Sequence, residues 1–386
     1  MIIRPKVRGF ICITAHPDGC KKNILEQISY VKTQGEIINS PKKVLIIGSS
    51  TGYGLASRVV ASFGCKADTI GIYFERPEVD NKPGSAGFYN AQALDEFSRE
   101  EGRLSESING DAFSDEIKGE AIRYIREKLG QIDCIIYSLA SPRRTDPISG
   151  KTYKSVLKPI GVSFSGKTVN TDTEQIVEIF IDPATEEEIE ATCKVMGGED
   201  WERWIDQLLG ANVLAEGVQT CAYSYIGPEV TWPIYAHGTI GKAKDHLEQS
   251  AKNIQNKLKK LQGKAMISVN KAVVTQASSA IPVVPLYNSI LFKIMKQKKI
   301  HEGCIEQMYR LFSSHFDANC DEQGRIHLDN LEMRDDVQQE VKAIWPKIST
   351  ENLHELSDFQ GYYQDFLRLF GFGVAGVNYE KDIKIS

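Results

Sequence analysis

Tyrosine–lysine pairs are the residues of this chain whose types and spacing are best suited to chemistry. A tyrosine hydroxyl can donate a proton to an oxygen that becomes negative, and a nearby lysine charge makes that hydroxyl more acidic. The spacing Y-x-x-x-K occurs at Tyr124 and Lys128, and a wider spacing links Tyr235 to Lys242 or Lys244. Because we expect the catalytic pair after the fifth strand and Tyr124 precedes the fourth, we interpret the first pair as part of a solvated helix face.

Helix periodicity decides between the two lysines that follow Tyr235. Apolar residues recur at intervals of three and four and predict one buried helix stripe, formed by Ile240, Ala243, Leu247, Ala251, Ile254, Leu258 and Leu261. At about 100° per residue, Lys244 lies about 60° from Leu247, whereas Lys242 lies about 140° away. We therefore predict that Lys244 faces inward and can reach a cofactor, and that Lys242 lies in solvent.

A glycine-rich loop predicts a site for the phosphates of a dinucleotide. Gly48, Gly52 and Gly54 follow an apolar strand at residues 44–48 and open a helix at residues 53–63. Glycines allow the backbone to approach a pyrophosphate closely. The first turn of the helix presents free N–H groups and the positive end of its dipole.

Residues at the ends of three further strands extend this cofactor site. Glu75 follows a strand at 69–74, where a carboxylate accepts hydrogen bonds from the adenosine ribose and repels a 2′-phosphate, which favours NADH. Arg76 leaves NADPH as an alternative cofactor, because an arginine can accommodate that phosphate. Asp111 could accept a hydrogen bond from the adenine amino group, and the small residues at 138–141 allow a ring to pass close to the backbone.

The elements that must position these residues alternate along the chain. Helical stretches separate β-branched runs at residues 44–48, 69–74, 132–139, 218–226 and 265–275. This alternation predicts an α/β fold with a doubly wound parallel sheet, the Rossmann plan. Ligands bind at the carboxyl ends of strands in such sheets. Tyr225 leaves the fifth strand there, and its hydroxyl could hold a substrate carbonyl.

We predict one large domain over residues 1–386. It includes a small β-containing excursion at about 141–200, beside the cofactor cleft, and a mostly helical region from about 285.

Composition excludes several other classes of protein. The 386 residues are 25% charged and 41% hydrophobic, with a net charge of −5, so no broad basic field indicates a nucleic-acid partner. No apolar run approaches the ~20 residues of a membrane span. The apolar patch near the N-terminus is too short for a signal-peptide core. The eight cysteines form no C-x-x-C pair and the seven histidines no H-x-x-x-H pair. We therefore expect a cytoplasmic protein with reduced thiols, no membrane insertion and no metal site.

Motifs along essentially the whole chain resemble those of the bacterial trans-2-enoyl-CoA reductases, also called FabV-type enoyl-[acyl-carrier-protein] reductases, which are similar to short-chain dehydrogenases/reductases. They include the glycine loop, the Tyr225 segment and the Tyr235–Lys244 spacing. Further matches lie at residues 16–20, 110–115, 137–142, 196–201 and 276–282.

The resemblance implies NADH-dependent reduction of trans-2-enoyl-CoA or enoyl-acyl-carrier-protein thioesters to saturated acyl thioesters, in fatty acid biosynthesis, by a monomer. It implies Tyr235 as proton donor, Lys244 as cofactor contact and Tyr225 as substrate contact. The implied NAD site consists of Gly48, Ser49, Ser50, Thr51, Gly52, Tyr53, Phe74, Glu75, Asp111, Ala112, Leu139, Ala140, Lys244, Val273, Val274 and Thr275. Two alternatives remain open: reduction of a ketone or 3-oxoacyl thioester by the same fold, and a non-catalytic NAD-binding regulator.

Overall fold

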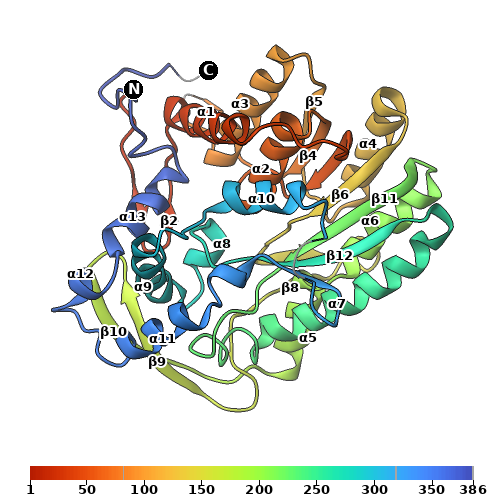
Figure 1. Ribbon diagram of the computed structural model, residues 1–386. Coiled ribbons are helices and arrows are strands. Elements are labelled where there is room, and N and C mark those ends of the chain that lie inside the picture. The colour runs from red at the N-terminus through yellow and green to blue at the C-terminus, as the bar shows by residue number, and fades with distance from the viewer. Residues whose placement is uncertain (81, 318–319, 385–386) are drawn as a thin grey trace.

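A seven-stranded parallel sheet forms the centre of the computed structural model, which describes residues 1–80, 82–317 and 320–384 (Figure 1). The strand order is β13-β12-β11-β6-β3-β4-β5. The chain therefore builds the sheet outward in both directions from β3, which confirms the predicted doubly wound fold. The strands are β3 (Lys43–Ile47), β4 (Asp68–Tyr73), β5 (Ser105–Asn109), β6 (Ile132–Tyr137), β11 (Leu214–Ser224), β12 (Lys264–Val269) and β13 (Arg325–His327).

Helices cover both faces of the sheet, which explains why its central strands are apolar throughout. On β3, Val44 and Ile46 face one layer, Leu45 and Ile47 face the other, and all four are buried. The first layer contains α1 (Pro17–Gln34), α2 (Gly52–Val59), α3 (Ala86–Glu100) and α10 (Cys304–Ser313). The second contains α4 (Asp115–Tyr124), α6 (Glu199–Gly210) and α7 (Thr239–Leu258).

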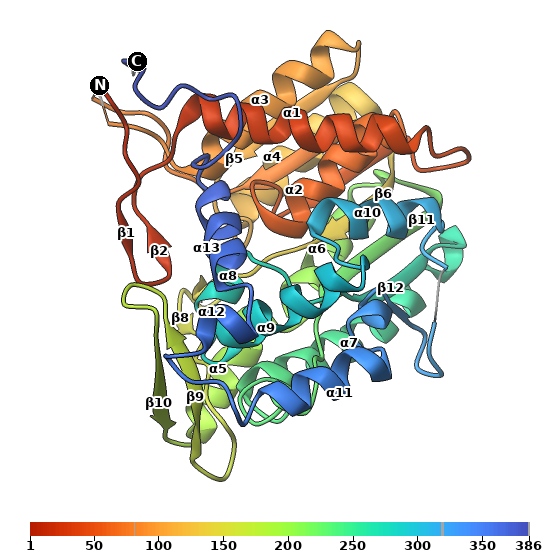
Figure 2. The ribbon, with the colours of Figure 1, turned by 60° about the vertical axis from the view of Figure 1, so that its left-hand side comes forward.

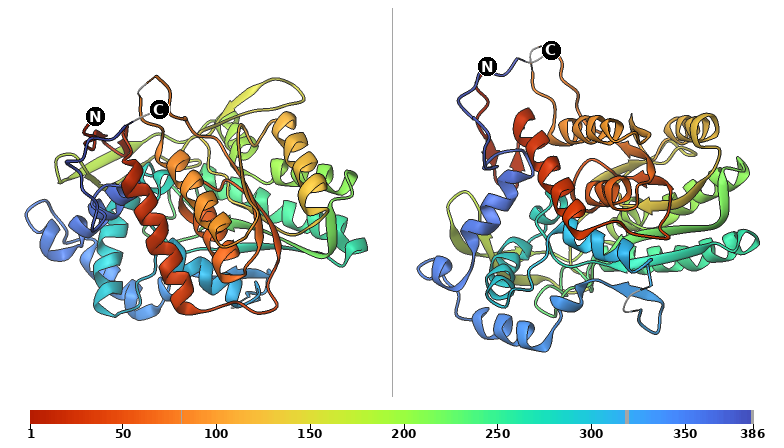
Figure 3. Two further views of the ribbon diagram at one scale, coloured as in Figure 1. Left: turned by 90° about the horizontal axis from the view of Figure 1, so that it is seen from above. Right: turned by 45° about the horizontal axis from the view of Figure 1, so that its top comes forward.

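The C-terminal helices form a third apolar cluster beside the sheet. They are α9 (Val284–Gln297), α11 (Asp335–Ile344), α12 (Leu353–Leu356) and α13 (Phe359–Arg368). Figure 3 shows α1 between α3 and this C-terminal group, and the Asn23 side chain of α1 donates to the Arg368 carbonyl at 3.4 Å. Met1 lies beside the last described residues of the chain (Figure 2), where its amino group donates to the Ile383 carbonyl at 2.7 Å.

Three antiparallel hairpins lie outside the main sheet. They are β1 (Val7–Arg8) with β2 (Ile11–Cys12), β7 (Arg143–Thr145) with β8 (Thr152–Lys154), and β9 (Phe164–Asn170) with β10 (Gln175–Ile181). Two further α-helices are α5 (Glu186–Met196), which packs on α7, and the short α8 (Gln276–Ser279). Among the described residues, no helix combines the length and apolar character needed to cross a membrane.

The sixth strand is shorter than the run at 265–275 predicted. It ends at Val269 because the partner strands on both sides end there: the Asn270 amide donates to the Ser224 carbonyl of β11, and the Leu328 amide donates to the Val269 carbonyl, both at 2.9 Å. Residues 270–275 thus form a loop at the carboxyl ends of the strands. The seventh strand, β13, was not predicted, because its three residues carry no periodic signal.

Candidate active site

The residues expected to bind a dinucleotide converge at the carboxyl ends of β3, β4, β5 and β6. Gly48 has φ +88°, and a Cβ atom on it would lie 2.4 Å from the Ser138 carbonyl oxygen after β6. A Cβ atom on Gly54 would lie 1.8 Å from the Gly48 oxygen. The Gly48 and Ser49 amides both donate to the Ile72 carbonyl of β4, at 2.9 and 3.0 Å. Glycine is therefore required where the loop packs against its neighbours, and the loop is tied to two strands.

Glu75 is held in place beside this loop. Its carboxylate accepts a hydrogen bond from the Ser50 hydroxyl at 2.8 Å. Its backbone amide and carbonyl both pair with the Asn109 side chain, each at 2.9 Å. A Cβ atom on Gly87 of α3 would lie 2.1 Å from the Glu75 Oε1 atom, so that glycine makes room for the carboxylate. Arg76 is exposed and donates to the Pro83 carbonyl at 3.3 Å.

The Asp111–Ala112 turn is anchored by a buried ion pair that sequence reasoning missed. The Ala112 carbonyl accepts from the Lys118 ammonium at 2.7 Å and from the Trp204 indole at 3.1 Å. Lys118 also pairs with buried Asp200 at 2.8 Å. The segment at 196–201 contained part of the signal, because Asp200 lies in it, in the first turn of α6.

The second wall of the site is the loop after β12. Val273 and Val274 are buried, and Thr275 accepts from the Ser278 amide at 3.0 Å and so caps α8. A Cβ atom on Gly52 would lie 3.2 Å from the Thr275 Cγ2 atom, so this loop touches the glycine loop. A cavity of about 390 Å³ borders both loops at Thr51, Gly52, Val273 and Val274, although most of its lining comes from α1, residues 301–306 and the end of α13.

The structure gives the partner or the exposure of three further residues expected to contact the cofactor. The Tyr53 hydroxyl donates to the Lys271 carbonyl at 2.7 Å. Phe74 is 73% exposed, and Ala140 is also exposed. Leu139 stays against the glycine loop, with its Cδ2 atom 3.2 Å from the position of a Cβ on Gly48.

Tyr235 lies buried in the turn that leads from β11 to α7. Its side chain is 7% exposed, and its ring meets the Tyr225 ring edge-on, with centroids 4.9 Å apart. Its carbonyl accepts from the Gly241 amide at 2.9 Å, which joins the turn to the first residues of α7. Burial raises the pKa of Tyr235 above its ordinary value, so the hydroxyl keeps its proton.

The two lysines of α7 lie on opposite sides of the helix, as its periodicity predicted. Lys244 is half-buried, and its amino group donates to the Tyr223 carbonyl of β11 at 3.0 Å. Burial lowers the pKa of Lys244 to about 8. Lys242 is exposed and pairs with Asp245 at 3.5 Å. The competing Tyr124 lies on α4, where its hydroxyl donates to Glu106 at 3.0 Å.

Tyr225 has a partner that the sequence did not reveal. Its hydroxyl donates to the Oε1 atom of Glu332 at 3.0 Å. Burial first, and the Glu332 charge second, raise the pKa of Tyr225. No spacing rule relates the two residues, because they are 107 positions apart.

Family models match nearly all of this chain. The model described as the trans-2-enoyl-CoA reductase catalytic region matches residues 82–316. The chain belongs to the trans-2-enoyl-CoA reductase family. Two further models match this reductase: the NAD(P)H binding domain of trans-2-enoyl-CoA reductase at residues 2–80, and a model described as the enoyl reductase FAD binding domain at residues 320–383.

Known relatives of the reductase are similar over their full lengths. The enoyl-[acyl-carrier-protein] reductase [NADH] of Saccharophagus degradans is 55% identical, with 99% of this chain and 98% of the relative covered. The trans-2-enoyl-CoA reductase [NADH] of Clostridium perfringens is 55% identical, with all of both chains covered. The crystal structure of Treponema denticola trans-2-enoyl-CoA reductase in complex with NAD has a TM-score of 0.95 and 49% identity, covering 99% of this chain and 98% of that one.

The residues of the third matched segment do not fit FAD. β13 is followed directly by Leu328 and Asp329, where a dinucleotide site of this type needs a glycine-rich loop that opens a helix. The helices α11 and α13 instead pack on α9, and α12 packs on α13, within one apolar cluster.

Proposed function

We propose that this chain reduces the carbon–carbon double bond of trans-2-enoyl thioesters with NADH. The observation that carries the proposal is the buried Tyr235, which lies next to the end of β11 with Lys244 on the following helix. The glycine loop of a dinucleotide site also lies at the carboxyl ends of the strands of this sheet. Membership of the trans-2-enoyl-CoA reductase family supports the same chemistry.

The residues of the glycine loop fit the phosphates of NADH. Gly48, Gly52 and Gly54 expose backbone where side chains would collide, and Thr51, the residue before α2, makes no side-chain cap on the first turn of that helix. Glu75 would accept from the adenosine ribose, and Asp111 with Ala112 would border the adenine. The walls nearer the nicotinamide would be Leu139, Ala140 and Val273–Thr275.

NADH, when bound, supplies the hydride for the β-carbon of the substrate. Charge then builds on the thioester oxygen, and a fixed hydroxyl that points at this oxygen stabilises the transition state more than the ground state. Tyr235 has that proton available because burial raises its pKa. Lys244 would hold the cofactor ribose, and Tyr225 would contact the substrate beside Tyr235.

Initial rates of NADH oxidation test the proposal. We expect turnover of crotonyl-CoA and little turnover of acetoacetyl-CoA at the same concentration. The opposite preference would make the protein a carbonyl reductase, and NADH binding without turnover of either substrate would make it a regulator.

We further propose that the enzyme is a monomer that works in the cytoplasm in fatty acid biosynthesis, on CoA or carrier-protein thioesters. Its cysteines, all free, suit a reducing compartment.

A further inference from the structure

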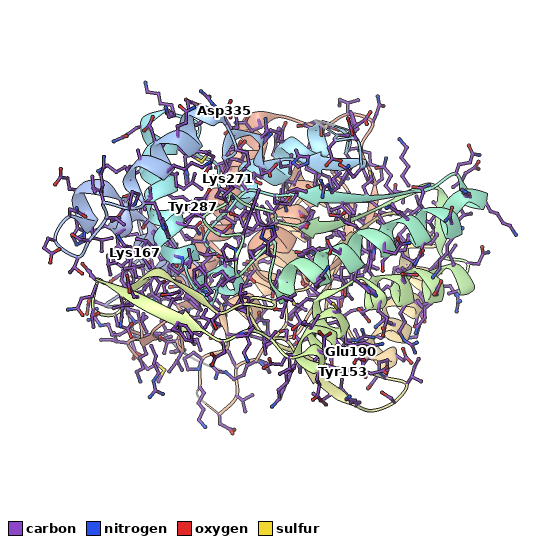
Figure 4. The ribbon with its side chains drawn as sticks, turned by 90° about the horizontal axis from the view of Figure 1, so that it is seen from below. Tyr153, Lys167, Glu190, Lys271, Tyr287 and Asp335 are labelled. Carbon is purple, nitrogen blue, oxygen red and sulfur yellow. The ribbon has the colours of Figure 1, made fainter. Side chains whose placement is uncertain are left out.

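A buried carboxylate joins three segments of the site that are far apart in the sequence. Glu332 follows β13 and is completely buried. Its Oε1 atom accepts from the hydroxyls of Tyr225 at 3.0 Å and Tyr287 at 2.6 Å. Its Oε2 atom accepts from the Ala272 amide at 2.7 Å. Tyr287 on α9 and Lys271, the neighbour of Ala272, lie in the same region in Figure 4.

One branch of this network leads to the proposed proton donor. Tyr225 packs edge-on against Tyr235, with an angle of 80° between the rings. A tyrosine hydroxyl has a single proton, and Tyr225 directs it to Glu332. The carboxylate therefore sets the position of the ring against which Tyr235 packs.

The other branch leads to the wall expected beside the nicotinamide. Ala272 directly precedes Val273, and its amide is held by Glu332. Its carbonyl accepts from the Lys271 ammonium at 2.7 Å, so polar groups hold this residue on both sides. A shift of the Ala272 peptide would move the loop that touches Gly52 through Thr275.

We propose that Glu332 is a positioning residue for the proposed reduction, holding Tyr225 against Tyr235 and the 272–275 loop against the cofactor site with one carboxylate. The inference rests on the proposed function. It also gives the C-terminal segment a role in the chemistry, because Glu332 enters the site from there.

Two substitutions separate the branches. In Glu332→Gln the side-chain oxygen can still accept from the Ala272 amide, whereas the NH₂ group replaces the acceptor of the Tyr225 proton. We expect kcat with crotonyl-CoA to fall roughly 10- to 100-fold, since a misplacement of about 1 Å can cost about 10²-fold, while the Kd for NADH stays within about twofold. Glu332→Ala removes both contacts, so we expect kcat to fall and the Kd for NADH to rise by roughly fivefold or more. Asp335 is an exposed carboxylate in the same segment. Asp335→Asn is therefore the matched control, and it should change neither kcat nor the Kd for NADH.

A double-mutant cycle with Tyr225→Phe tests the path of the effect. If Glu332 acts through Tyr225, Glu332→Gln costs no further kcat in the Tyr225→Phe background. Fully additive losses, or a Glu332→Gln enzyme with wild-type kcat, would overturn the proposal. If Glu332→Ala does not fold, Glu332→Gln and the cycle decide. A wild-type protein without crotonyl-CoA turnover would overturn the proposed function instead, and the NADH Kd of Glu332→Ala would then decide the cofactor branch.

Discussion

Tyr235 and Lys244 respond to burial in opposite ways, and both responses suit their proposed tasks. Burial disfavours the charged form of each group. It raises the pKa of Tyr235, which therefore keeps a proton to donate. It lowers the pKa of Lys244 to about 8, close to neutrality, and the Tyr223 carbonyl is the partner of the amino group. An anionic cofactor beside Lys244 would favour its charged form.

Tyr235→Phe should lower turnover of crotonyl-CoA by roughly 10²–10⁴-fold, the usual range for a positioned proton donor. The ring remains, so its packing on Tyr225 and the affinity for NADH should hardly change. Steady-state rates and a fluorescence titration with NADH measure the two effects. Wild-type turnover in this variant would transfer the role to Tyr225.

Lys244→Ala and Lys242→Ala form a matched pair on one helix. The first should lower kcat and weaken NADH binding together, because it removes the inward ammonium. The second should be nearly silent, because Lys242 is exposed and its pair with Asp245 is a surface pair. Rates and NADH affinities of the two variants decide the matter, and a reversed outcome would favour the shorter Tyr–Lys spacing.

Glu75→Ala should weaken NADH binding and improve the relative use of NADPH. The lost contact is a charge-assisted hydrogen bond worth ~1.5–3 kcal/mol, or about 10- to 150-fold in affinity. The repulsion of a 2′-phosphate disappears as well, and Arg76 next to it is exposed and available. The Kd values of both cofactors for both proteins test this. An unchanged NADH/NADPH ratio would make Glu75 an ordinary acid that only supports Ser50.

At the scale of the elements, the close packing of α2 on the loop after β3 depends on the absence of a Cβ atom at Gly54. A Cβ at Gly54 would overlap the Gly48 carbonyl, which cannot move without the loop. Gly119 in α4 differs, because nothing lies within 4 Å of its Cβ position. The same substitution therefore has opposite consequences in two helices.

Gly54→Ala should lose NADH binding and lower the free energy of unfolding by roughly 1–3 kcal/mol, as overpacking does. Gly119→Ala should keep full activity and raise the free energy of unfolding by about 0.5–1 kcal/mol, because alanine is the better helix former. Urea unfolding and NADH titration measure both. Equal effects of the two substitutions would contradict the predicted role of the glycine loop.

At the scale of the whole molecule, buried thiols link stability to pH. Burial raises the pKa of all eight cysteines. An unfolded thiol ionises near pH ~8.5, so this stability is complete below that pH and is lost as the pH rises. Lysines act in the opposite sense, because burial lowers the pKa of Lys118 and lowers those of Lys244 and Lys271 to about 8, below the unfolded value.

The eight thiols outweigh the three lysines, so the free energy of unfolding should fall by more than about 1 kcal/mol between about pH 7.5 and 9.5. Urea midpoints at both pH values measure the change. Lys244→Met removes one opposing group and should make the fall steeper. A wild-type protein that becomes more stable over this interval would show that the thiols ionise in the folded state.

The sequence by itself determined those features of the protein that depend on residues close together along the chain. Alternating β-branched runs and helical stretches predicted the parallel sheet, and the glycine spacing predicted the loop between β3 and α2. The inward position of Lys244 followed from a stripe within one helix, because helical periodicity is a local property. The nearly complete motif match predicted the family, which the comparisons confirmed.

Only the tertiary structure decided which residues, distant in the sequence, hold these local features in place. Glu332 reaches Tyr225 across 107 positions, and Lys118 reaches Asp200 across 82. Strand β12 ends at Val269 because its neighbours end, and the Tyr53 hydroxyl turns inward because the Lys271 carbonyl lies there. Such contacts depend on the path of the whole chain, because a buried polar group needs whichever partner the fold brings to it, and no local spacing encodes that partner.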